Sequence, residues 1–181
     1  MATQIIVLNG GSSSGKTGIA RCLQAILPRP WLRLGVDDLI GALPPSLSGV
    51  LGSGSGVELG PAGEVAIGDG FRAAEAAWLA GIAAMAHAGA RIVVDDVFLS
   101  GAASQARLRS AFAGLEVLWV GVRCDASVAA AREMARGDRV PGMAASQAEL
   151  AHKGVVYDVS VDTGHAEALD CARLVAARVI A

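Results

Sequence analysis

Glycine, serine, lysine and threonine stand together at residues 10–17, directly after a short apolar run and before a helical pattern. The stretch from Gly10 to Thr17 matches G-x-x-x-x-G-K-[ST], in which backbone N–H groups point at phosphate oxygens. Lysine places a compact charge beside the β and γ phosphates, and threonine offers a hydroxyl to Mg²⁺. The alternative is a glycine-rich turn with an incidental lysine, but the strand-to-helix context favours a nucleotide site. We expect an ATP phosphate loop made of Gly10, Gly11, Ser12, Ser13, Ser14, Gly15, Lys16 and Thr17.

Two carboxylates, Asp95 and Asp96, close the apolar run 91–97. Ligands of open α/β sheets bind at the carboxyl ends of the strands, so one of the pair could hold Mg²⁺ through water. Asp95 is only slightly the better candidate of the two. A helix N-cap or a solvated strand end is the structural alternative. We expect the metal to be held by Thr17 and, via water, by Asp95.

A second pair of carboxylates, Asp37 and Asp38, follows the strand-like residues 31–36. A carboxylate beside the phosphate loop can accept a hydrogen bond from an acceptor hydroxyl and then its proton. Asp37 directly follows the run and is the first candidate for this base, with Asp38 in reserve. The alternative is an N-cap for a short helix over 37–43.

Arginines cluster in the stretch AREMARGDR, where Arg132, Arg136 and Arg139 would share one face of a continuing helix. Gly137 could break that helix. On a lid over about 132–146, such arginines would neutralise the transferring phosphoryl group and exclude water. A solvated helical face is the alternative. Arg132 and Arg136 are the candidates for catalysis, and Arg132 and Arg139 for nucleotide binding.

The last apolar run ends in VDTGH. A loop at that place in P-loop kinases lies near the adenine, so Asp162 and Thr163 are candidates for contact with the base. A plain strand-to-helix turn explains them equally well.

Apolar and helical patterns alternate along the chain and must position these groups. Short β-branched runs bounded by Gly, Pro or Asp predict strands at 5–9, 31–36, 91–97, 115–122 and 155–161. Helical patterns run from near Gly15 to before Pro28 and over 70–88, 102–112, 125–136 and 165–180. This alternation predicts an α/β fold with five parallel strands flanked by helices in three layers, the P-loop kinase fold.

Composition restricts the partners. The 181 residues fit one domain, and a net charge of -2 is unfavourable for a nucleic-acid binder or a membrane-surface protein. Three scattered cysteines form no metal or disulfide pattern, and no signal peptide is apparent, so we expect a cytoplasmic protein with small-molecule partners. Homo-oligomerisation stays open.

The stretches IIVLNGGSSSGKTGIARCLQ, PWLRLGVDDLI, AAMAHAGARIVVDDVFL and VLWVGVRCDASVAAAREMARGDRV, with the ending YDVSVDT, resemble chloramphenicol phosphotransferase over nearly the whole chain. The resemblance implies transfer of the γ-phosphate of ATP to the primary hydroxyl of chloramphenicol, which inactivates the antibiotic. It also implies that the base falls on Asp37 and the lid arginines on AREMARGDR.

The segment 44–70 is rich in glycine, and a loop of that length is usually a lid, a binding loop or disorder. It departs from the family, whose corresponding stretch is less glycine-rich and more acidic. We expect it to form a variable acceptor loop together with apolar side chains that could hold a nitrophenyl ring. These side chains are Trp78, Met85, Phe98 and Leu99, each of which could equally be core, with core the better reading for Trp78 and Met85.

Two other functions are compatible with the same motifs. A kinase of a metabolic alcohol, such as a sugar acid or shikimate, would need an arginine near the acceptor, and Arg33 and Arg72 are the candidates. A regulatory module that hydrolyses ATP slowly would use the glycine-rich segment to grip a partner.

Overall fold

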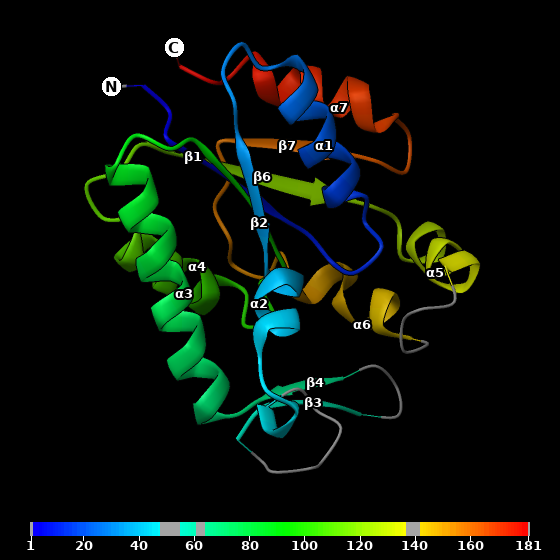
Figure 1. Ribbon diagram of the computed structural model, residues 1–181. Helices are drawn as coiled ribbons and strands as arrows, with labels where there is room; N and C mark the ends of the chain where they lie inside the picture. The colour runs from blue at the N-terminus through cyan, green and yellow to red at the C-terminus, as the bar shows by residue number, and fades with distance from the viewer. Residues whose placement is uncertain (1, 48–54, 61–63, 137–141, 181) are drawn as a thin grey trace.

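A five-stranded parallel sheet forms the centre of the computed structural model, which describes residues 2–47, 55–60, 64–136 and 142–180 (Figure 1). The strands are ordered β2-β5-β1-β6-β7 from one edge to the other. Their bounds are Ile5–Asn9 (β1), Leu32–Gly35 (β2), Ile92–Asp96 (β5), Val117–Arg123 (β6) and Val159–Asp162 (β7). Each overlaps the range predicted for it, and the predicted α/β class is confirmed.

Helices cover both faces of this sheet. Helices α1 (Lys16–Ile26) and α7 (Ala168–Ala176) pack on one face, and α3 (Asp69–His87) and α4 (Ala102–Ala111) on the other (Figure 1). The remaining elements are α2 (Val36–Ala42), a 3₁₀ turn (Pro45–Leu47), β3 (Val57–Leu59), β4 (Val65–Ile67), α5 (Ala126–Arg136) and α6 (Met143–Leu150).

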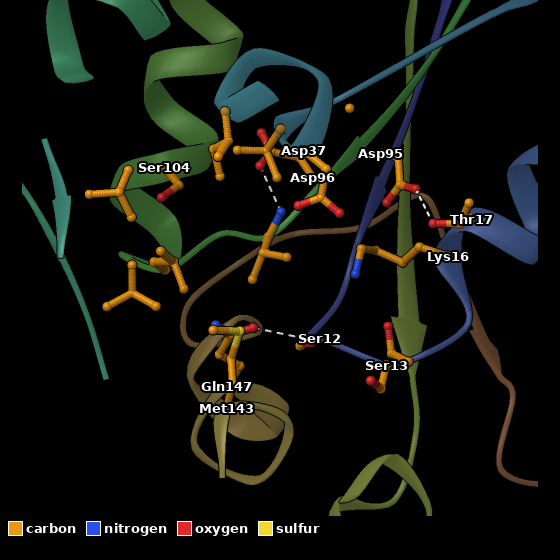
Figure 2. Close-up of a pocket in the computed structure, with 18 of the residues that line it drawn as sticks. Ser12, Ser13, Lys16, Thr17, Asp37, Asp95, Asp96, Ser104, Met143 and Gln147 are labelled. Atoms are coloured by element: carbon orange, nitrogen blue, oxygen red, sulfur yellow. Dashed lines mark hydrogen bonds between the residues drawn. The ribbon is translucent and has the colours of Figure 1, made fainter. Parts of the chain in front are cut away.

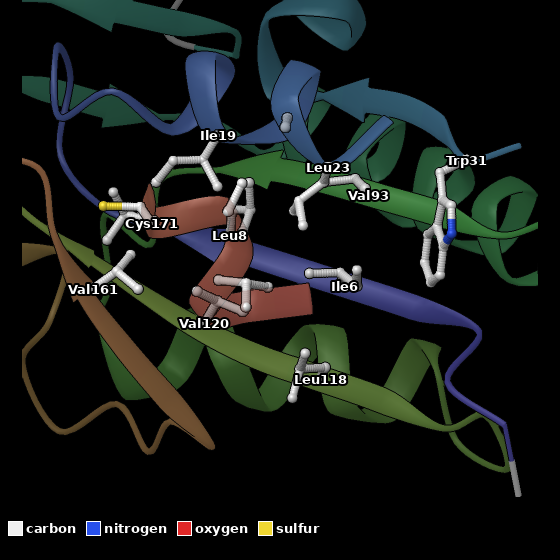
Figure 3. Close-up of a cluster of buried hydrophobic side chains, with 14 residues drawn as sticks. Ile6, Leu8, Ile19, Leu23, Trp31, Val93, Leu118, Val120, Val161 and Cys171 are labelled. Atoms are coloured by element: carbon white, nitrogen blue, oxygen red, sulfur yellow. The ribbon is translucent and has the colours of Figure 1, made fainter. Parts of the chain in front are cut away.

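Strand β1 shows why its sequence is apolar at every position. Ile6 and Leu8 belong to the cluster under α1 and α7 (Figure 3), whereas Ile5 and Val7 belong to the cluster under α3 and α4. Successive side chains of a strand point to opposite faces, so a strand covered on both faces has no solvent side. All four of these side chains are fully buried.

The register of the central strands brings the polar ends together. Leu8 pairs with Asp95 and Asn9 with Asp96, while Gly35 at the end of β2 pairs with Asp95. Parallel strands end at one edge of the sheet, so the segments that follow β1, β2 and β5 all start there. These are the segments in which the phosphate loop and both carboxylate pairs were predicted.

The glycine-rich segment contains a short antiparallel hairpin, β3–β4, which the sequence did not predict. Val57 on β3 is buried in a third cluster with Leu39 of α2 and Phe71 of α3. The hairpin therefore lies over α2 and the start of α3 (Figure 1). Residues 48–54 and 61–63 of the segment lie outside the described residues.

Two further elements differ from the predictions. Helix α6 was not predicted, and α7 occupies only the middle of the predicted 165–180. None of the helices in the described part of the chain is long and apolar enough to cross a membrane.

Candidate active site

A cavity of about 580 Å³ opens at the carboxyl edge of the sheet (Figure 2). The phosphate loop forms one side, and the ends of β2 and β5 form the middle. The β3–β4 hairpin, the first turns of α3, and α4 to α6 form the rest. The cavity therefore joins a phosphate-binding end to a chamber large enough for a small molecule.

The phosphate loop leaves β1 and enters α1 through Gly15, whose φ of 87° lies in the left-handed region that favours glycine. A side chain at Gly10 would collide with the carbonyl oxygen of Val122. No side chain caps α1, and the hydroxyls of Ser13 and Ser14 are buried without a hydrogen-bond partner among the described residues. A phosphate would accept hydrogen bonds from these donors, so the loop fits the predicted nucleotide.

Lys16 lies against the same loop. It is only 7% exposed, and its Nζ donates a hydrogen bond to the carbonyl oxygen of Gly11 at 2.8 Å. A buried ammonium needs negative partners, which the β and γ phosphates of a bound nucleotide would supply.

The two predicted metal-binding residues contact each other. Thr17 Oγ1 donates to Asp95 Oδ2 at 2.7 Å, and Asp95 is buried. Because the hydroxyl hydrogen points at Asp95, the lone pairs of Oγ1 remain available to a cation. Within the described ranges no group of three or more His, Cys, Asp or Glu could form a metal cage. The pair fits Mg²⁺, which in kinase sites takes one or two protein ligands together with water and phosphate.

Asp96 has a different environment from Asp95. Its Oδ1 accepts the backbone N–H of Val97 at 2.6 Å, and its side chain lines the cavity. Burial raises the pKa of Asp96 to about 7, and the charges of Glu75 and Asp95 act in the same direction, while the Val97 hydrogen bond and Lys16 oppose them. The geometry thus favours Asp95 as the metal-side carboxylate.

Asp37 and Asp38 have different surroundings in the first turn of α2. Asp38 Oδ2 accepts the backbone N–H of Gly35 at 2.6 Å, and its Oδ1 lies 3.4 Å from Arg33 Nη2. Asp38 is therefore the third residue of the helix and completes a capping box, whereas the N-cap that was considered for this pair is Gly35. Asp37 lines the cavity, near Asp96 in Figure 2.

Arg132 lines both the main cavity and a second cavity of about 400 Å³ on the other side of the phosphate loop from Asp37. Its Nη2 donates to the carbonyl oxygen of Thr163 at 2.8 Å, and Thr163 Oγ1 donates to the Ser14 carbonyl at 2.7 Å. Thr163, Gly164 and Arg132 all line the second cavity. This placement fits the nucleoside part of the predicted nucleotide.

Asp162 has a structural role in the same turn. Its carboxylate accepts the Gly164 N–H at 2.8 Å, which lowers the pKa of Asp162, and His165 lies 3.2 Å away.

The other two arginines of the predicted lid are not both described. Arg136 is the last residue of α5, whereas Arg139 lies outside the described residues.

Helix α6 supplies two residues that sequence reasoning missed. Gln147 Oε1 accepts the backbone N–H of Ser12 at 2.9 Å, and Met143 lines the cavity. The buried carboxylate of Glu133 accepts the N–H groups of Gly142 and Ala144, both at 2.8 Å, and so fixes the start of the helix. No local motif marks these residues, because their roles depend on tertiary contacts.

The chamber beyond Asp37 has an apolar wall. Its side chains come from α2, the hairpin and α3 and are joined by one of the four predicted acceptor residues, Leu99. The wall consists of Val36, Ile40, Val57, Val65, Ile67, Phe71 and Leu99.

The other predicted acceptor residues lie in the core. Phe98 is 1% exposed and packs at 6.4 Å, ring centre to ring centre, against Trp119. Trp78 and Met85 pack against the same buried cluster. Among the residues lining the cavity, the hairpin and Phe71 take the place of Trp78 and Phe98. Trp78 lies in the middle of α3 and packs against buried clusters, whereas Phe98 follows β5, and a side chain next to a strand end can point either way.

A charged group lines the same cavity as the apolar wall. Glu75 Oε2 lies 2.8 Å from Arg72 Nη1 and 3.3 Å from Arg107 Nε, and all three line the cavity. Arg107 also donates to Ser104 Oγ at 3.1 Å. Sequence reasoning considered Arg72 but missed Arg107, whose place in the site depends on the packing of α4 beside α3.

Solved structures of other proteins share this fold. A gluconokinase from Sinorhizobium meliloti is 21% identical with a TM-score of 0.62, over 98% of this chain and 93% of that chain. An APS kinase from Mycobacterium tuberculosis, solved with AMPPNP and APS, is 16% identical with a TM-score of 0.62, over 96% and 95%. These likenesses confirm the P-loop kinase fold.

Sequence comparison is more specific. Proteins from two strains of Mycobacterium tuberculosis, whose names mark them as inferred O-phosphotransferases, are 33% identical over 177 residues, covering 88% of this chain and 75% of theirs. The family described as "Chloramphenicol phosphotransferase-like protein" matches residues 3–180. A match of this length shows that the chain belongs to the chloramphenicol phosphotransferase-like family.

Proposed function

We propose that the protein is an ATP-dependent O-phosphotransferase that phosphorylates the primary hydroxyl of chloramphenicol or a related antibiotic and so confers resistance. One observation carries the proposal: Asp37 lies in a single cavity between the phosphate loop and an apolar wall. Membership of the family supports the reaction class, and the names of the mycobacterial relatives agree with it.

The residues around the loop would hold the nucleotide. Lys16 and the loop amides bind the β and γ phosphates, and Arg132 with Thr163 borders the nucleoside. When bound at Thr17 and Asp95, Mg²⁺ supplies neutralisation of the phosphate charge. Arg136 and Arg139 of the predicted lid would add charge neutralisation as it closes.

Asp37 would orient the acceptor. Its carboxylate accepts a hydrogen bond from the hydroxyl and directs the oxygen toward the γ-phosphorus. The new O–P bond forms as the bond to the bridging oxygen breaks, ADP leaves with that electron pair, and the hydroxyl proton passes to Asp37. Phosphoryl transfer is loose, so positioning and charge neutralisation contribute more than the strength of the base.

The apolar wall favours an aromatic acceptor. Val57, Ile67 and Phe71 offer a surface to a flat ring, while Arg72 and Arg107 can donate to polar substituents. Both guanidinium groups are already paired with Glu75, and Arg33 lies beside Asp38 and Asp95. Since carboxylates of the chain itself offset these charges, a neutral acceptor with polar groups fits better than an acid.

The second candidate is a kinase of a metabolic alcohol. The presence of Arg33, Arg72 and Arg107 around one cavity is the observation that favours it, because a carboxylate-bearing acceptor needs such donors. A nucleotide-binding regulatory module is the third reading.

One experiment separates these functions. The protein is incubated with Mg-ATP and a panel of hydroxylated antibiotics and metabolites, and each mixture is searched by mass spectrometry for a product heavier by one phosphoryl group. Phosphorylated chloramphenicol supports the proposal, and a phosphorylated metabolite alone supports the second candidate. Loss of ATP without any phosphorylated acceptor supports the third reading, the nucleotide-binding regulatory module. Lys16→Ala is the control that should abolish every signal.

A further inference from the structure

Helix α6 places a buried amide on the phosphate loop. Gln147 is 4% exposed, lines the cavity, and accepts the Ser12 N–H through Oε1 at 2.9 Å, as the dashed line in Figure 2 shows. The amide therefore contacts one of the backbone donors that the loop presents to phosphate.

The helix that carries Gln147 is held at both ends. Glu133 binds the N–H groups at its start, and Asn9 Nδ2 donates to the carbonyl oxygen of Ala151 at its end, at 2.7 Å. In the middle, a Cβ added at Gly11 would come within 3.1 Å of the Gln147 backbone. These contacts fix the backbone of Gln147 beside the loop, within reach of the Ser12 N–H.

Lys16 and Gln147 contact the same peptide unit. The carbonyl of Gly11 accepts from Lys16 Nζ at 2.8 Å, and the N–H of that unit, on Ser12, donates to Gln147 at 2.9 Å. The lysine of a phosphate loop reaches the β and γ phosphates, so the amide lies at the γ-phosphate end of the loop. A side-chain amide also carries two donors, and among the residues that the structure describes none accepts a hydrogen bond from Gln147 Nε2.

We propose that Gln147 binds the terminal phosphate of the nucleotide, with Nε2 donating to an oxygen of the γ-phosphate. The proposal rests on ATP binding in the proposed function but not on the identity of the acceptor. ADP lacks the oxygens that Nε2 would contact. Gln147 thus contributes to the preference of the protein for ATP over ADP.

The test measures nucleotide binding alone. Calorimetry with Mg²⁺ compares AMPPNP and ADP on the intact protein and on Gln147→Ala. A hydrogen bond to a charged group contributes about 1.5–3 kcal/mol, so we expect AMPPNP to bind roughly 10-fold to 100-fold more weakly while ADP changes less than about twofold. Equal losses for both nucleotides would show that Gln147 only ties α6 to the loop, and no loss would exclude the contact.

Two further variants sharpen the test. Gln147→Glu keeps an oxygen for the Ser12 N–H but has no donor, so it should weaken AMPPNP more than ADP even if Gln147→Ala folds poorly. If Gln147→Glu weakens the binding of AMPPNP and of ADP by the same factor relative to the unmodified protein, the proposal is overturned. Glu149→Gln is the matched control, because Glu149 is exposed on the same helix and is not among the residues that line the cavity, and it should leave both affinities unchanged. If the unmodified protein binds neither nucleotide, the proposed function itself fails, an outcome distinct from a failure confined to the Gln147 variants.

Discussion

Asp37 and Asp38 are adjacent, yet their replacement should affect different properties of the protein. Asp37 lines the cavity, whereas Asp38 accepts the Gly35 N–H at 2.6 Å in the capping box of α2. Asp37→Asn keeps the shape of the side chain but cannot take the hydroxyl proton. We expect it to lower kcat while ATP still binds.

The magnitudes follow from these contacts. General base catalysis contributes about 10²–10⁴-fold, and the loose transition state favours the lower end, so kcat should fall about 100-fold in Asp37→Asn. Asp38→Asn retains an oxygen for the Gly35 N–H, and its kcat should stay within about threefold. Asp38→Ala removes this capping-box hydrogen bond, which costs about 1 kcal/mol, or about 2–4 °C in Tm for a chain of this length.

Three measurements are made on each variant. They are the steady-state kcat with the acceptor that the substrate panel identifies, the ATP affinity by calorimetry, and the thermal unfolding temperature. The assignment of the base is wrong if Asp37→Asn turns over every accepted substrate at the normal rate. It is equally wrong if Asp38→Asn loses as much turnover as Asp37→Asn.

Three more changes test the site. Gly10→Ala drives a methyl group into the Val122 carbonyl, so it should lower the free energy of unfolding by about 1–3 kcal/mol in urea titrations, and an unchanged midpoint would contradict the packing. The pKa of Asp96 is raised from 3.8 to about 7, so the folded chain holds a proton that the unfolded chain releases, and stability falls as the pH rises from about 4 to 7. Asp96→Asn should therefore be more stabilising at pH 8 than at pH 5, and equal effects at both would refute the raised pKa. Arg132→Ala removes the bonds to Thr163 and should raise the KM for ATP about tenfold with little change in acceptor KM; a change in acceptor KM alone would place Arg132 elsewhere.

The positions of the residues at the phosphate end follow from the sequence, because that end is locally encoded; their roles stay predictions. The loop is contiguous, and the register of parallel strands brings Asp37 and Asp95 to the same edge once the order of strands is given. The central strands were equally readable, since burial on both faces makes Ile5 to Leu8 apolar at each position.

The acceptor end could not be predicted to the same extent. Strands β3 and β4 have three residues each, too few for alternation to be recognised. Val57 is buried in a cluster with Leu39 and Phe71, which come from other elements of the chain. Helix α6 carries no capping residue of its own; its N–H groups are satisfied by Glu133 of another helix. Phe98 shows the same limit, since composition does not say whether a side chain at a strand end faces the cavity or the core.

The position of β1 in the sheet has a consequence for the order of events during synthesis. The central strand β1 precedes both of its neighbours along the chain, and Ile5 pairs with Ile92 of β5 and with Val117 of β6. Asn9, at the start of the phosphate loop, also holds the carbonyl of Ala151, 142 residues away along the chain. Long-range pairing of this kind forms late. During synthesis the loop is therefore made before the segments that hold it, and we expect a nascent chain to bind nucleotide only after β5, β6 and Ala151 have left the ribosome.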